Sequence, residues 1–236
     1  MNNDVICVIP ARGGSKRISR KNMKLFHGLP IIQYSINTAI GSNIFKDIYV
    51  YSDCNQIKSL STNIGANCGI DRNSNISDDY TTLSETLLEF LNSFLKKKKY
   101  LPLYVCCLLP TAPLLKPQRL ISAFELLSKE NADSIYPIVE FSYPVQRGLT
   151  LNNSGYLERK WPEFERSRSQ DLPPLYHDAG QFYFIKSEAF LRYNSFIMPR
   201  TIPIKMKKIE VQDIDTIEDW EIAELKYQYL KNINEG

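Results

Sequence analysis

A segment near the N-terminus concentrates positive charge in a way that suits a compact polyanion. Residues 5–46 contain no Asp or Glu but seven cations, which are Arg12, Lys16, Arg17, Arg20, Lys21, Lys24 and Lys46. Gly13 and Gly14 lie among them and allow backbone amides to approach a ligand closely. Amides and cations together can surround a triphosphate. The Walker spacing Gly-x-x-x-x-Gly-Lys-Ser/Thr is absent from this segment, so the expected phosphate loop is of another kind.

Two carboxylates near the C-terminus are candidates for a metal site. Asp213 and Asp215 are two residues apart at the end of an expected strand, so both side chains should point to one face. Two hard oxygen ligands together with triphosphate oxygens suit octahedral Mg²⁺, which keeps several waters. Alternatively, either Asp is a cap or loop residue, because Thr216 and Asp219 form a Thr-x-x-Asp capping box directly after them.

Polar residues elsewhere have a functional and a structural interpretation. Asn22 offers an amide donor and acceptor that match a cytosine edge, and Arg72 suits either a base or a phosphate. Thr81 and Thr82 can bond a nucleotide, but Thr82 and Glu85 also form a capping box for a helix. The charge run 96–99 is interpreted as the solvated end of that helix, where cations meet the negative end of the dipole.

Residues 141–179 break the regular pattern and are interpreted as a small insertion with hairpin character. Arg147 and Arg168 are candidates to bind a sugar carboxylate through bidentate pairs, or else are surface or dimer-contact charges. His177 lies near polar residues that can hold such a sugar, although a lone His is more often structural. The aromatic side chains of the insertion favour a subunit interface: Tyr156, Trp161 and Phe164.

The elements that must position these residues alternate between strands and helices. Short apolar runs predict strands over 5–9, 47–51, 103–109, 134–139, 181–185 and 203–211. Amphipathic patterns predict helices over 30–40, 55–63, 82–97, 117–128 and 216–232. This order favours an α/β fold, a mainly parallel sheet with helices on both faces. The basic loop then follows the first strand, at the carboxyl end of the sheet where ligands bind.

Composition narrows the class of protein. The chain has 236 residues, of which 43% are apolar and 23% charged. A chain of this length and composition can bury a core large enough for one domain without disulfides or a structural metal. Five cysteines without a Cys-x-x-Cys pair favour reduced thiols and a cytoplasmic location, and two histidines make a zinc site improbable. Outside the basic segment, 22 cations face 26 acids, because 7 of the 29 Lys and Arg residues lie in 5–46. We therefore expect no nucleic-acid partner. The two long uncharged stretches are rich in Asn, Gln and Ser (25–45) or hold three prolines (100–115), so we also expect no membrane span.

The motifs also resemble one enzyme family. Residues 9–22 resemble the nucleotide-binding signature of the sialic-acid-type cytidylyltransferases, and the likeness continues through Gly28–Ser35, Ser52-Asp53, Arg72 with Ser77–Thr82, Leu109–Pro113 and Asp213–Thr216. Three further blocks, 144–149, 168–172 and 176–183, resemble the pseudaminic acid group of that family. The sequence departs from the usual pattern at Leu29 (Lys in the family), Ser19 (Pro) and Leu109 (Gln in sialic-acid enzymes).

The resemblance implies a single cytidylyltransferase domain over 1–236, a three-layer Rossmann-like fold of the nucleotide-diphospho-sugar transferase (GT-A-like) type. It implies that CTP and a nonulosonic acid, pseudaminic acid, give a CMP-sugar and pyrophosphate with Mg²⁺. The alternatives are legionaminate, N-acetylneuraminate or octulosonate as the sugar, or a CTP-binding module without catalysis. A homodimer through 141–179 is expected.

The implied site residues fall into four sets. The catalytic residues are Arg12, Lys21, Asp213 and Asp215, of which Asp213 and Asp215 are also the metal ligands. The nucleotide-binding residues are Ala11, Arg12, Gly13, Gly14, Ser15, Lys21, Asn22, Arg72, Thr81 and Thr82. The sugar-binding residues are Leu109, Thr111, Gln146, Arg147, Arg168, Gln170, His177 and Gln181. Leu109 in place of Gln argues against N-acetylneuraminate, because Leu cannot form a hydrogen bond.

Overall fold

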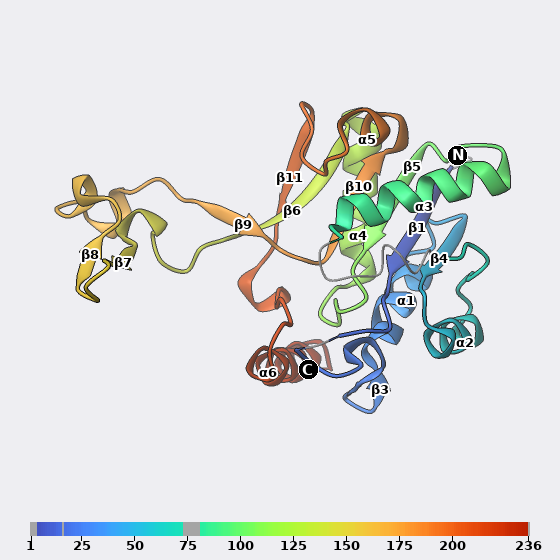
Figure 1. Cartoon of the computed structure of the whole chain (residues 1–236), viewed down its shortest axis with the longest axis horizontal. Helices are drawn as coiled ribbons and strands as arrows, with labels where there is room; N and C mark the ends of the chain where they lie inside the picture. Colours follow the sequence, from blue (N-terminus) through green and yellow to red (C-terminus); the bar gives the residue numbers. More distant parts are fainter. Residues whose placement is uncertain (1–3, 16, 73–80, 236) are drawn as a thin grey trace.

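A mixed sheet with helices on both faces forms the body of the protein, and an arm projects from it (Figure 1). The computed structural model describes residues 4–15, 17–72 and 81–235. Lys16 and residues 77–80, which belong to the block Ser77–Thr82 that resembles the family, lie outside this part. The main strands are β1 (Val5–Pro10), β4 (Asp47–Tyr51), β5 (Tyr104–Leu108), β6 (Ser134–Glu140), β9 (Tyr176–Asp178), β10 (Phe182–Lys186) and β11 (Thr201–Lys205). The helices are α1 (Ile31–Ser42), α2 (Asn55–Ile64), α3 (Leu83–Lys98), α4 (Pro117–Lys129), α5 (Ser187–Tyr193) and α6 (Ile217–Glu235).

The strand order is β11-β6-β10-β5-β1-β4, with β9 paired to β6. β1 pairs parallel with β4 and β5, and β6 pairs parallel with β11. β10 lies antiparallel between β5 and β6, so β4, β1, β5, β6 and β11 all run in one direction. The expected mainly parallel sheet is therefore confirmed, with one central strand reversed.

Alternating side chains of the central strands feed two cores. Val5, Cys7 and Ile9 of β1 pack with α1, α2 and α4 on one face of the sheet. Ile6 and Val8 pack on the other face, against the apolar side of α3 and against Phe190 of α5. The residues of α3 in this core are Leu87, Phe90, Leu91 and Phe94. Burial on both faces explains why these strands are continuous apolar runs rather than alternating ones.

A third, smaller core lies under the candidate site. It joins the basic loop to the C-terminal helix through Ile18, Phe26, Ile214 and Trp220. Phe26 belongs to a short hairpin, β2 (Leu25–Phe26) with β3 (Leu29–Pro30), that follows the 3₁₀ turn Lys21–Met23. This cluster brings residues about 200 positions apart in sequence into contact.

The helix signals in the sequence are confirmed where they are local. Thr82 Oγ1 accepts the Glu85 amide, and the Glu85 carboxylate accepts the Thr82 amide, so the capping box of α3 forms. Thr216 and Asp219 make the same reciprocal pair at the start of α6. α3 ends in Lys96–Lys98, as the interpretation of the charge run requires.

The strand expected over 203–211 is wrong in its extent. β11 ends at Lys205, and a 3₁₀ turn (Lys208–Glu210) follows. In the register with its partner β6, Lys205 lies opposite Ile138, two residues before β6 ends at Glu140, so the parallel pairing can extend no more than two residues beyond Lys205. Asp213 and Asp215 consequently lie in a loop before α6, not at a strand end.

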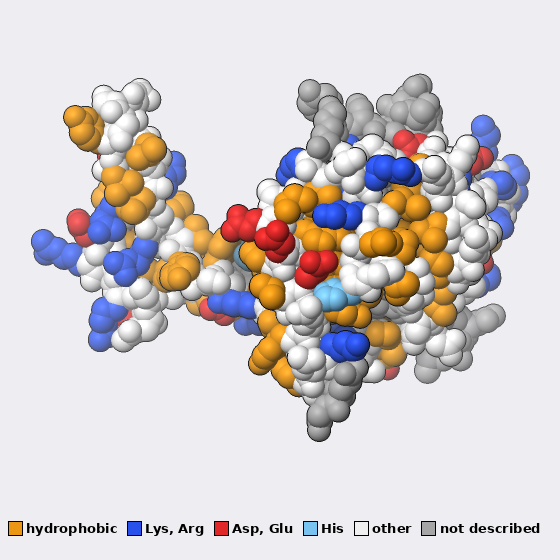
Figure 2. Space-filling model, turned by 90° about the horizontal axis from the view of Figure 1, so that it is seen from below, with side chains coloured by type: hydrophobic (Ala, Val, Ile, Leu, Met, Phe, Trp, Pro, Cys, Tyr) orange, Lys and Arg blue, Asp and Glu red, His pale blue; other side chains and the backbone are white. Residues whose placement is uncertain are grey.

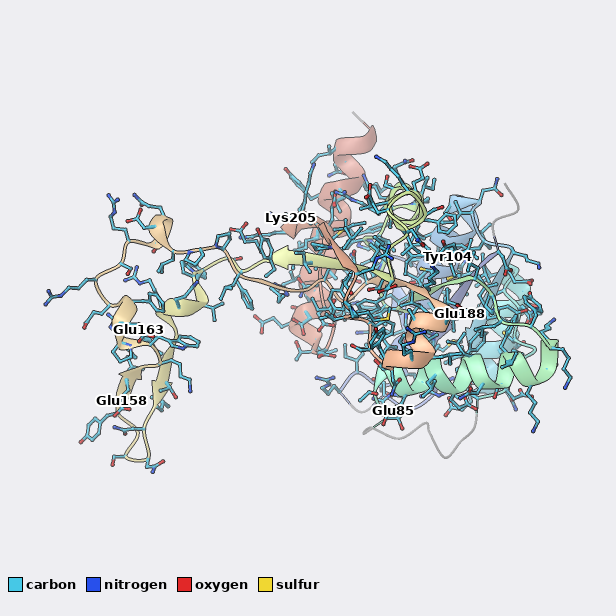
Figure 3. The ribbon with its side chains drawn as sticks, turned by 90° about the horizontal axis from the view of Figure 1, so that it is seen from above. Glu85, Tyr104, Glu158, Glu163, Glu188 and Lys205 are labelled. Atoms are coloured by element: carbon cyan, nitrogen blue, oxygen red, sulfur yellow. The ribbon has the colours of Figure 1, made fainter. Side chains whose placement is uncertain are left out.

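Residues between β6 and β9 form the arm (Figure 1). It carries the hairpin of β7 (Leu149–Leu151) and β8 (Leu157–Arg159), and short 3₁₀ turns at Val145–Arg147, Pro162–Phe164 and Ser169–Asp171. Figure 3 places Glu158 and Glu163 far out on the arm, apart from Glu85, Tyr104 and Glu188 of the body. In the described part of the chain, no helix has both the length and the apolar character to span a membrane.

Candidate active site

The basic loop begins where β1 ends and is fixed by its neighbours rather than by its own conformation. The Gly13 amide donates to Asp53 Oδ1 at 2.9 Å, and a Cβ at position 13 would meet Cys54 Cβ at 2.8 Å. Gly13 is therefore required for close packing against Cys54, and its amide is used by Asp53. The expected approach of backbone amides to a ligand remains open at Gly14, where a Cβ would meet nothing within 4 Å.

Most of the predicted nucleotide residues line one open cavity of ≈ 660 Å³ at the carboxyl end of β1. This volume is within the ordinary range for small-molecule sites. The predicted residues on its wall are Arg12, Ser15, Lys21, Asn22, Arg72, Thr81, Leu109 and Thr111. Arg17 and Thr86 lie on the same wall and were not in the predicted set. The structure thus brings the loop cations and the polar residues before α3 to one place.

Two of the predicted base-recognition residues already have partners within the protein. Buried Asn22 donates its amide to the Arg12 carbonyl at 3.0 Å and so fixes the loop. Arg72 lies 6.0 Å from the ring of Tyr51, and its guanidinium is 3.5 Å from Thr86 Oγ1. Thr82 Oγ1 serves the capping box, so the structural interpretation of Thr82 holds in this structure.

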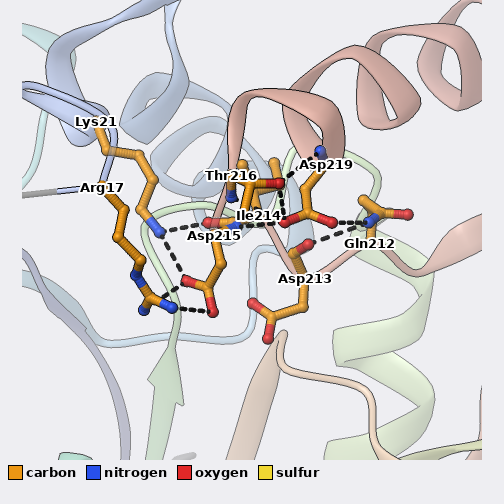
Figure 4. Close-up of polar contacts among 8 residues, drawn as sticks. All are labelled: Arg17, Lys21, Gln212, Asp213, Ile214, Asp215, Thr216 and Asp219. Atoms are coloured by element: carbon orange, nitrogen blue, oxygen red, sulfur yellow. Dashed lines mark hydrogen bonds and ion pairs between the residues drawn. The ribbon is translucent and has the colours of Figure 1, made fainter.

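The candidate metal residues Asp213 and Asp215 lie beside the loop cations (Figure 4). Arg17 makes two contacts with the Asp215 carboxylate, both at 2.9 Å, and Lys21 Nζ lies 3.5 Å from Asp215 Oδ1. Lys21 Nζ also donates to the carbonyl of Ile214. Ile214 is buried against the core that contains Ile18, and this apolar anchor holds the two Asp residues against the basic loop.

The pKa of Asp213 is raised above its ordinary value. The first cause is desolvation by surrounding protein, since Asp213 lies on the wall of a hollow even though it remains accessible to water. The second is the nearby Asp215 carboxylate, with Lys21 opposing the shift. No hydrogen bond reaches the Asp213 carboxylate from the described residues. A desolvated, repelled carboxylate of this kind favours the approach of a cation.

Two carboxylates that leave other coordination positions open suit Mg²⁺ better than they suit a metal held entirely by protein ligands. In the described part of the chain, no cluster of three or more His, Cys, Asp or Glu residues could hold a metal. Asp219 is committed to the cap of α6, where Thr216 donors lower its pKa. The oxygen donors available are therefore Asp213 and Asp215, which leaves positions for water and phosphate oxygens.

A second hollow of ≈ 380 Å³ has Asp213 on its wall. It contains His177 and Asp178 of β9 together with Glu140 and Lys208. His177 Nδ1 lies 2.8 Å from the Asp178 carbonyl, and its ring packs on Phe141. This hollow places one predicted sugar residue, His177, next to a predicted metal ligand.

Asp178 is a site residue that sequence reasoning missed. Tyr136 and Tyr183 both donate to Asp178 Oδ2, at 2.8 and 2.6 Å, and the Gly180 amide donates to Oδ1 at 2.8 Å. Burial is the largest cause of the raised pKa of Tyr183, and the nearby Asp178 carboxylate is the second. The Tyr183 hydroxyl therefore keeps its proton and remains a hydrogen-bond donor to Asp178. Spacing in sequence could not reveal this carboxylate, because its donors come from β6 and β10.

The remaining predicted sugar residues divide into two groups. Gln181 is buried below the nucleotide cavity, donates to the Glu210 carbonyl and accepts the Leu109 amide at its own carbonyl. Gln146, Arg147, Arg168 and Gln170 lie on the arm, away from both hollows of this chain (Figure 1).

Contacts on the arm are local. Gln146 donates to the Pro173 carbonyl, Arg147 donates to Ser169, and Arg168 pairs with Asp171. A cavity of ≈ 1010 Å³ opens between the β7–β8 hairpin and the start of the arm, with Arg147 on its wall. The structure therefore does not bring these four residues to the site of the same chain.

Comparisons with known proteins identify the family and support the fold. The family model described as cytidylyltransferase matches residues 6–233. The chain is 39% identical over 94% of its length to pseudaminic acid cytidylyltransferase from Campylobacter jejuni, of which it covers 96%. It is 29% identical over 93% of its length to CMP-N,N'-diacetyllegionaminic acid synthase from Legionella pneumophila, of which it covers 94%. A CMP:2-keto-3-deoxy-manno-octonic acid synthetase solved with CTP shares the fold, with a TM-score of 0.67, 16% identity, and coverage of 94% of this chain and 97% of that one. The chain belongs to the cytidylyltransferase family.

Proposed function

We propose that this protein transfers CMP from CTP to a nonulosonic acid, pseudaminic acid, and releases pyrophosphate. The observation that carries the proposal is that Arg17 and Lys21, which line one nucleotide-sized cavity, both contact the carboxylate of Asp215. Positive charge for a triphosphate and carboxylates for a cation are the two parts that nucleotidyl transfer needs. Their juxtaposition depends on long-range packing and not on one motif.

In this proposal the triphosphate of CTP lies along the basic loop, held by Arg12 and Lys21. The anomeric hydroxyl of the nine-carbon 2-keto acid attacks the α-phosphorus in line, and pyrophosphate leaves. Catalysis is then mainly positioning and neutralisation of charge. Arg72 and Asn22, on the wall of the same cavity, are placed for the cytidine end.

Asp213 and Asp215 would hold Mg²⁺, which when bound supplies positive charge to the triphosphate. The raised pKa of Asp213 and the absence of a hydrogen bond to its carboxylate from the described residues support this assignment. Before the cation arrives, Arg17 and Lys21 neutralise Asp215 in its place.

For the sugar, the hollow beside Asp213 offers His177 and Asp178. Asp178 Oδ2 already accepts from two tyrosines, whereas Oδ1 accepts from the Gly180 amide and has capacity for one further hydroxyl or amide hydrogen. The relative at 39% identity carries the name pseudaminic acid cytidylyltransferase, which supports that sugar over the alternatives. Leu109 on the wall of the nucleotide cavity makes the pocket less polar where sialic-acid enzymes have Gln.

The placement of the arm supports a homodimer. Large apolar side chains are exposed along it, with Tyr143 at 84% and Tyr156 at 73%. Figure 2 shows such side chains gathered on the arm beside the body. An arm of this kind needs a partner to cover it. The arm of one copy would then bring Arg147 and Arg168 to the sugar site of the other. All five cysteines are unpaired, which supports a reducing compartment, the cytoplasm.

The proposal is tested by pyrophosphate release from CTP with pseudaminic acid, legionaminic acid, N-acetylneuraminic acid and an octulosonic acid, each at equal concentration. We expect release with CTP, with pseudaminic acid best, and release that is slower by about 10²–10³-fold from Asp213→Asn. Tight CTP binding without pyrophosphate release for any sugar would instead indicate a non-catalytic CTP-binding module. Sedimentation of the same sample tests the dimer, and a monomer at catalytic concentrations would contradict it.

A further inference from the structure

Arg17 lies beside both the nucleotide cavity and the carboxylate pair, and its side chain contacts Asp215 in this structure. Its guanidinium approaches both oxygens of Asp215, with Nη1 2.9 Å from Oδ2 and Nη2 2.9 Å from Oδ1 (Figure 4). The same residue lines the cavity assigned to the nucleotide. A bidentate fork of this kind matches a carboxylate and a phosphate equally well.

This pair covers the oxygens that a cation would need. Asp215 is one of the two carboxylates assigned to the divalent cation, and Arg17 occupies both of its oxygen atoms. Asp213, by contrast, takes no hydrogen bond from the described residues. A cation that arrives alone therefore meets one accessible carboxylate and one that is already engaged.

The two cations on Asp215 differ in how firmly they are held. The Lys21 side chain is 20% exposed and also donates to the Ile214 carbonyl, so Lys21 has a partner that stays in place. The Arg17 side chain is 68% exposed, and among the described residues its partner is Asp215. Exposed ion pairs are weak, so a nearby triphosphate can take Arg17 away at little cost.

We propose that Arg17 couples nucleotide and metal binding, by holding Asp215 in the free enzyme and moving to the triphosphate when CTP enters. The move frees Asp215 for the divalent cation. This inference rests on the proposed function. Because coupling between two ligands is reciprocal, the cation must strengthen CTP binding by the same factor. Arg17 is thus a positioning residue that acts through Asp215.

The test measures Mn²⁺ affinity by electron paramagnetic resonance of free Mn²⁺, with and without CTP and in the absence of sugar. We compare wild type with Arg17→Gln and with Arg20→Gln as the matched control. Arg20 lies in the same loop and has the same charge, but it bonds Gln56 rather than an aspartate. A third variant, Asp215→Asn, removes the carboxylate for which Arg17 and the cation compete.

We expect Arg17→Gln to bind Mn²⁺ about two- to fivefold more tightly than wild type without CTP, the range set by an exposed ion pair. The strengthening of Mn²⁺ binding by CTP should fall by the same factor, and in an Asp215→Asn background Arg17→Gln should have no effect. Equal Mn²⁺ affinity in wild type and Arg17→Gln, or the same gain in Arg20→Gln, overturns the coupling role. Failure of wild type to bind Mn²⁺ even with CTP overturns the metal assignment in the proposed function, and this inference with it.

Discussion

Lys21 provides the sharpest test of the nucleotide site. We predict that Lys21→Met weakens CTP binding by about 10- to 30-fold. Met keeps most of the length of the side chain, so the change removes the charge and its hydrogen bonds with little loss of packing. Lys21 lies on the wall of the nucleotide cavity and beside the carboxylate pair, so its loss affects both the phosphates and their surroundings.

The magnitude follows from what Lys21 does before CTP arrives. A hydrogen bond to a charged group contributes about 1.5–3 kcal/mol. In the free enzyme, however, Lys21 already donates to the Ile214 carbonyl and lies 3.5 Å from Asp215, and these contacts weaken when it turns to a phosphate. The net effect should therefore lie at or just below the lower end of that range, about 1.4–2 kcal/mol, which corresponds to the stated loss of affinity.

Isothermal titration with CTP measures the effect, and Lys98→Met is the matched control. Lys98 is an exposed Lys in the last turn of α3, and its side chain makes no hydrogen bond or ion pair with the described residues. Lys97 is unsuitable, because it donates to the Gly69 carbonyl at 2.6 Å. Thermal unfolding of both variants confirms that each is folded. A change of less than twofold in Lys21→Met, or an equal change in Lys98→Met, would refute the assignment of this loop to the triphosphate.

Four further predictions test the remaining parts of the site and the fold. Asp213→Asn and Asp215→Asn should each lower kcat for pyrophosphate release by about 10²–10³-fold, and near-normal turnover would contradict the metal assignment. Asp213→Asn should also raise the free energy of unfolding of the metal-free protein at pH 7, because the raised pKa of Asp213 means that its charge destabilises the fold. This gain in stability should shrink as the pH falls through the raised pKa, because the wild-type carboxyl is then protonated and uncharged. A gain that stays constant in denaturant titrations from pH 7 to pH 4 would exclude this cause. The kcat/KM ratio should favour pseudaminic acid over N-acetylneuraminic acid by at least about tenfold, since Leu109 cannot satisfy a polar group; equal values in side-by-side assays would remove the sugar assignment and leave cytidylyl transfer in place. Thr82→Ala should cost about 1 kcal/mol in urea unfolding through loss of the α3 capping box, whereas an unchanged midpoint would show that the cap contributes little.

The sequence predicted local features well because their causes are local. The capping box at Thr82 and Glu85, for example, needs residues three positions apart, and the helix begins directly after it. The parallel order of the first strands follows from the alternation of strands and helices. The direction of β10 does not follow from this alternation, because an antiparallel strand between β5 and β6 depends on how the chain returns from the arm to the sheet.

In the candidate site, too, features with local causes were predictable from the sequence and features with long-range causes were not. The basic loop was visible as a charge asymmetry, and the cavity confirms that most of its predicted residues lie together. Asp213 and Asp215 were placed at a strand end, which is wrong, yet they remain close because buried Ile214 fixes the loop between them. Asp178 was missed, since its two tyrosine donors are supplied by separate strands.

The position of β10 has a consequence for how the chain reaches its fold. β10 lies between β5 and β6 but follows both in the sequence. During synthesis, β4, β1 and β5 can pair as soon as they emerge, whereas β6 cannot join them until residues 182–186 have been made. Until then β5 keeps an open edge, a template for pairing with other chains.

Nascent chains that end before β10 should for this reason be prone to aggregate, and closure of the sheet should come late. The arm that precedes β10 adds little to the cost of that closure, because the entropy of closing a loop grows only slowly with its length. Its length can therefore vary while the order of assembly stays the same, with one reversed strand as the piece that joins the two parallel parts of the sheet.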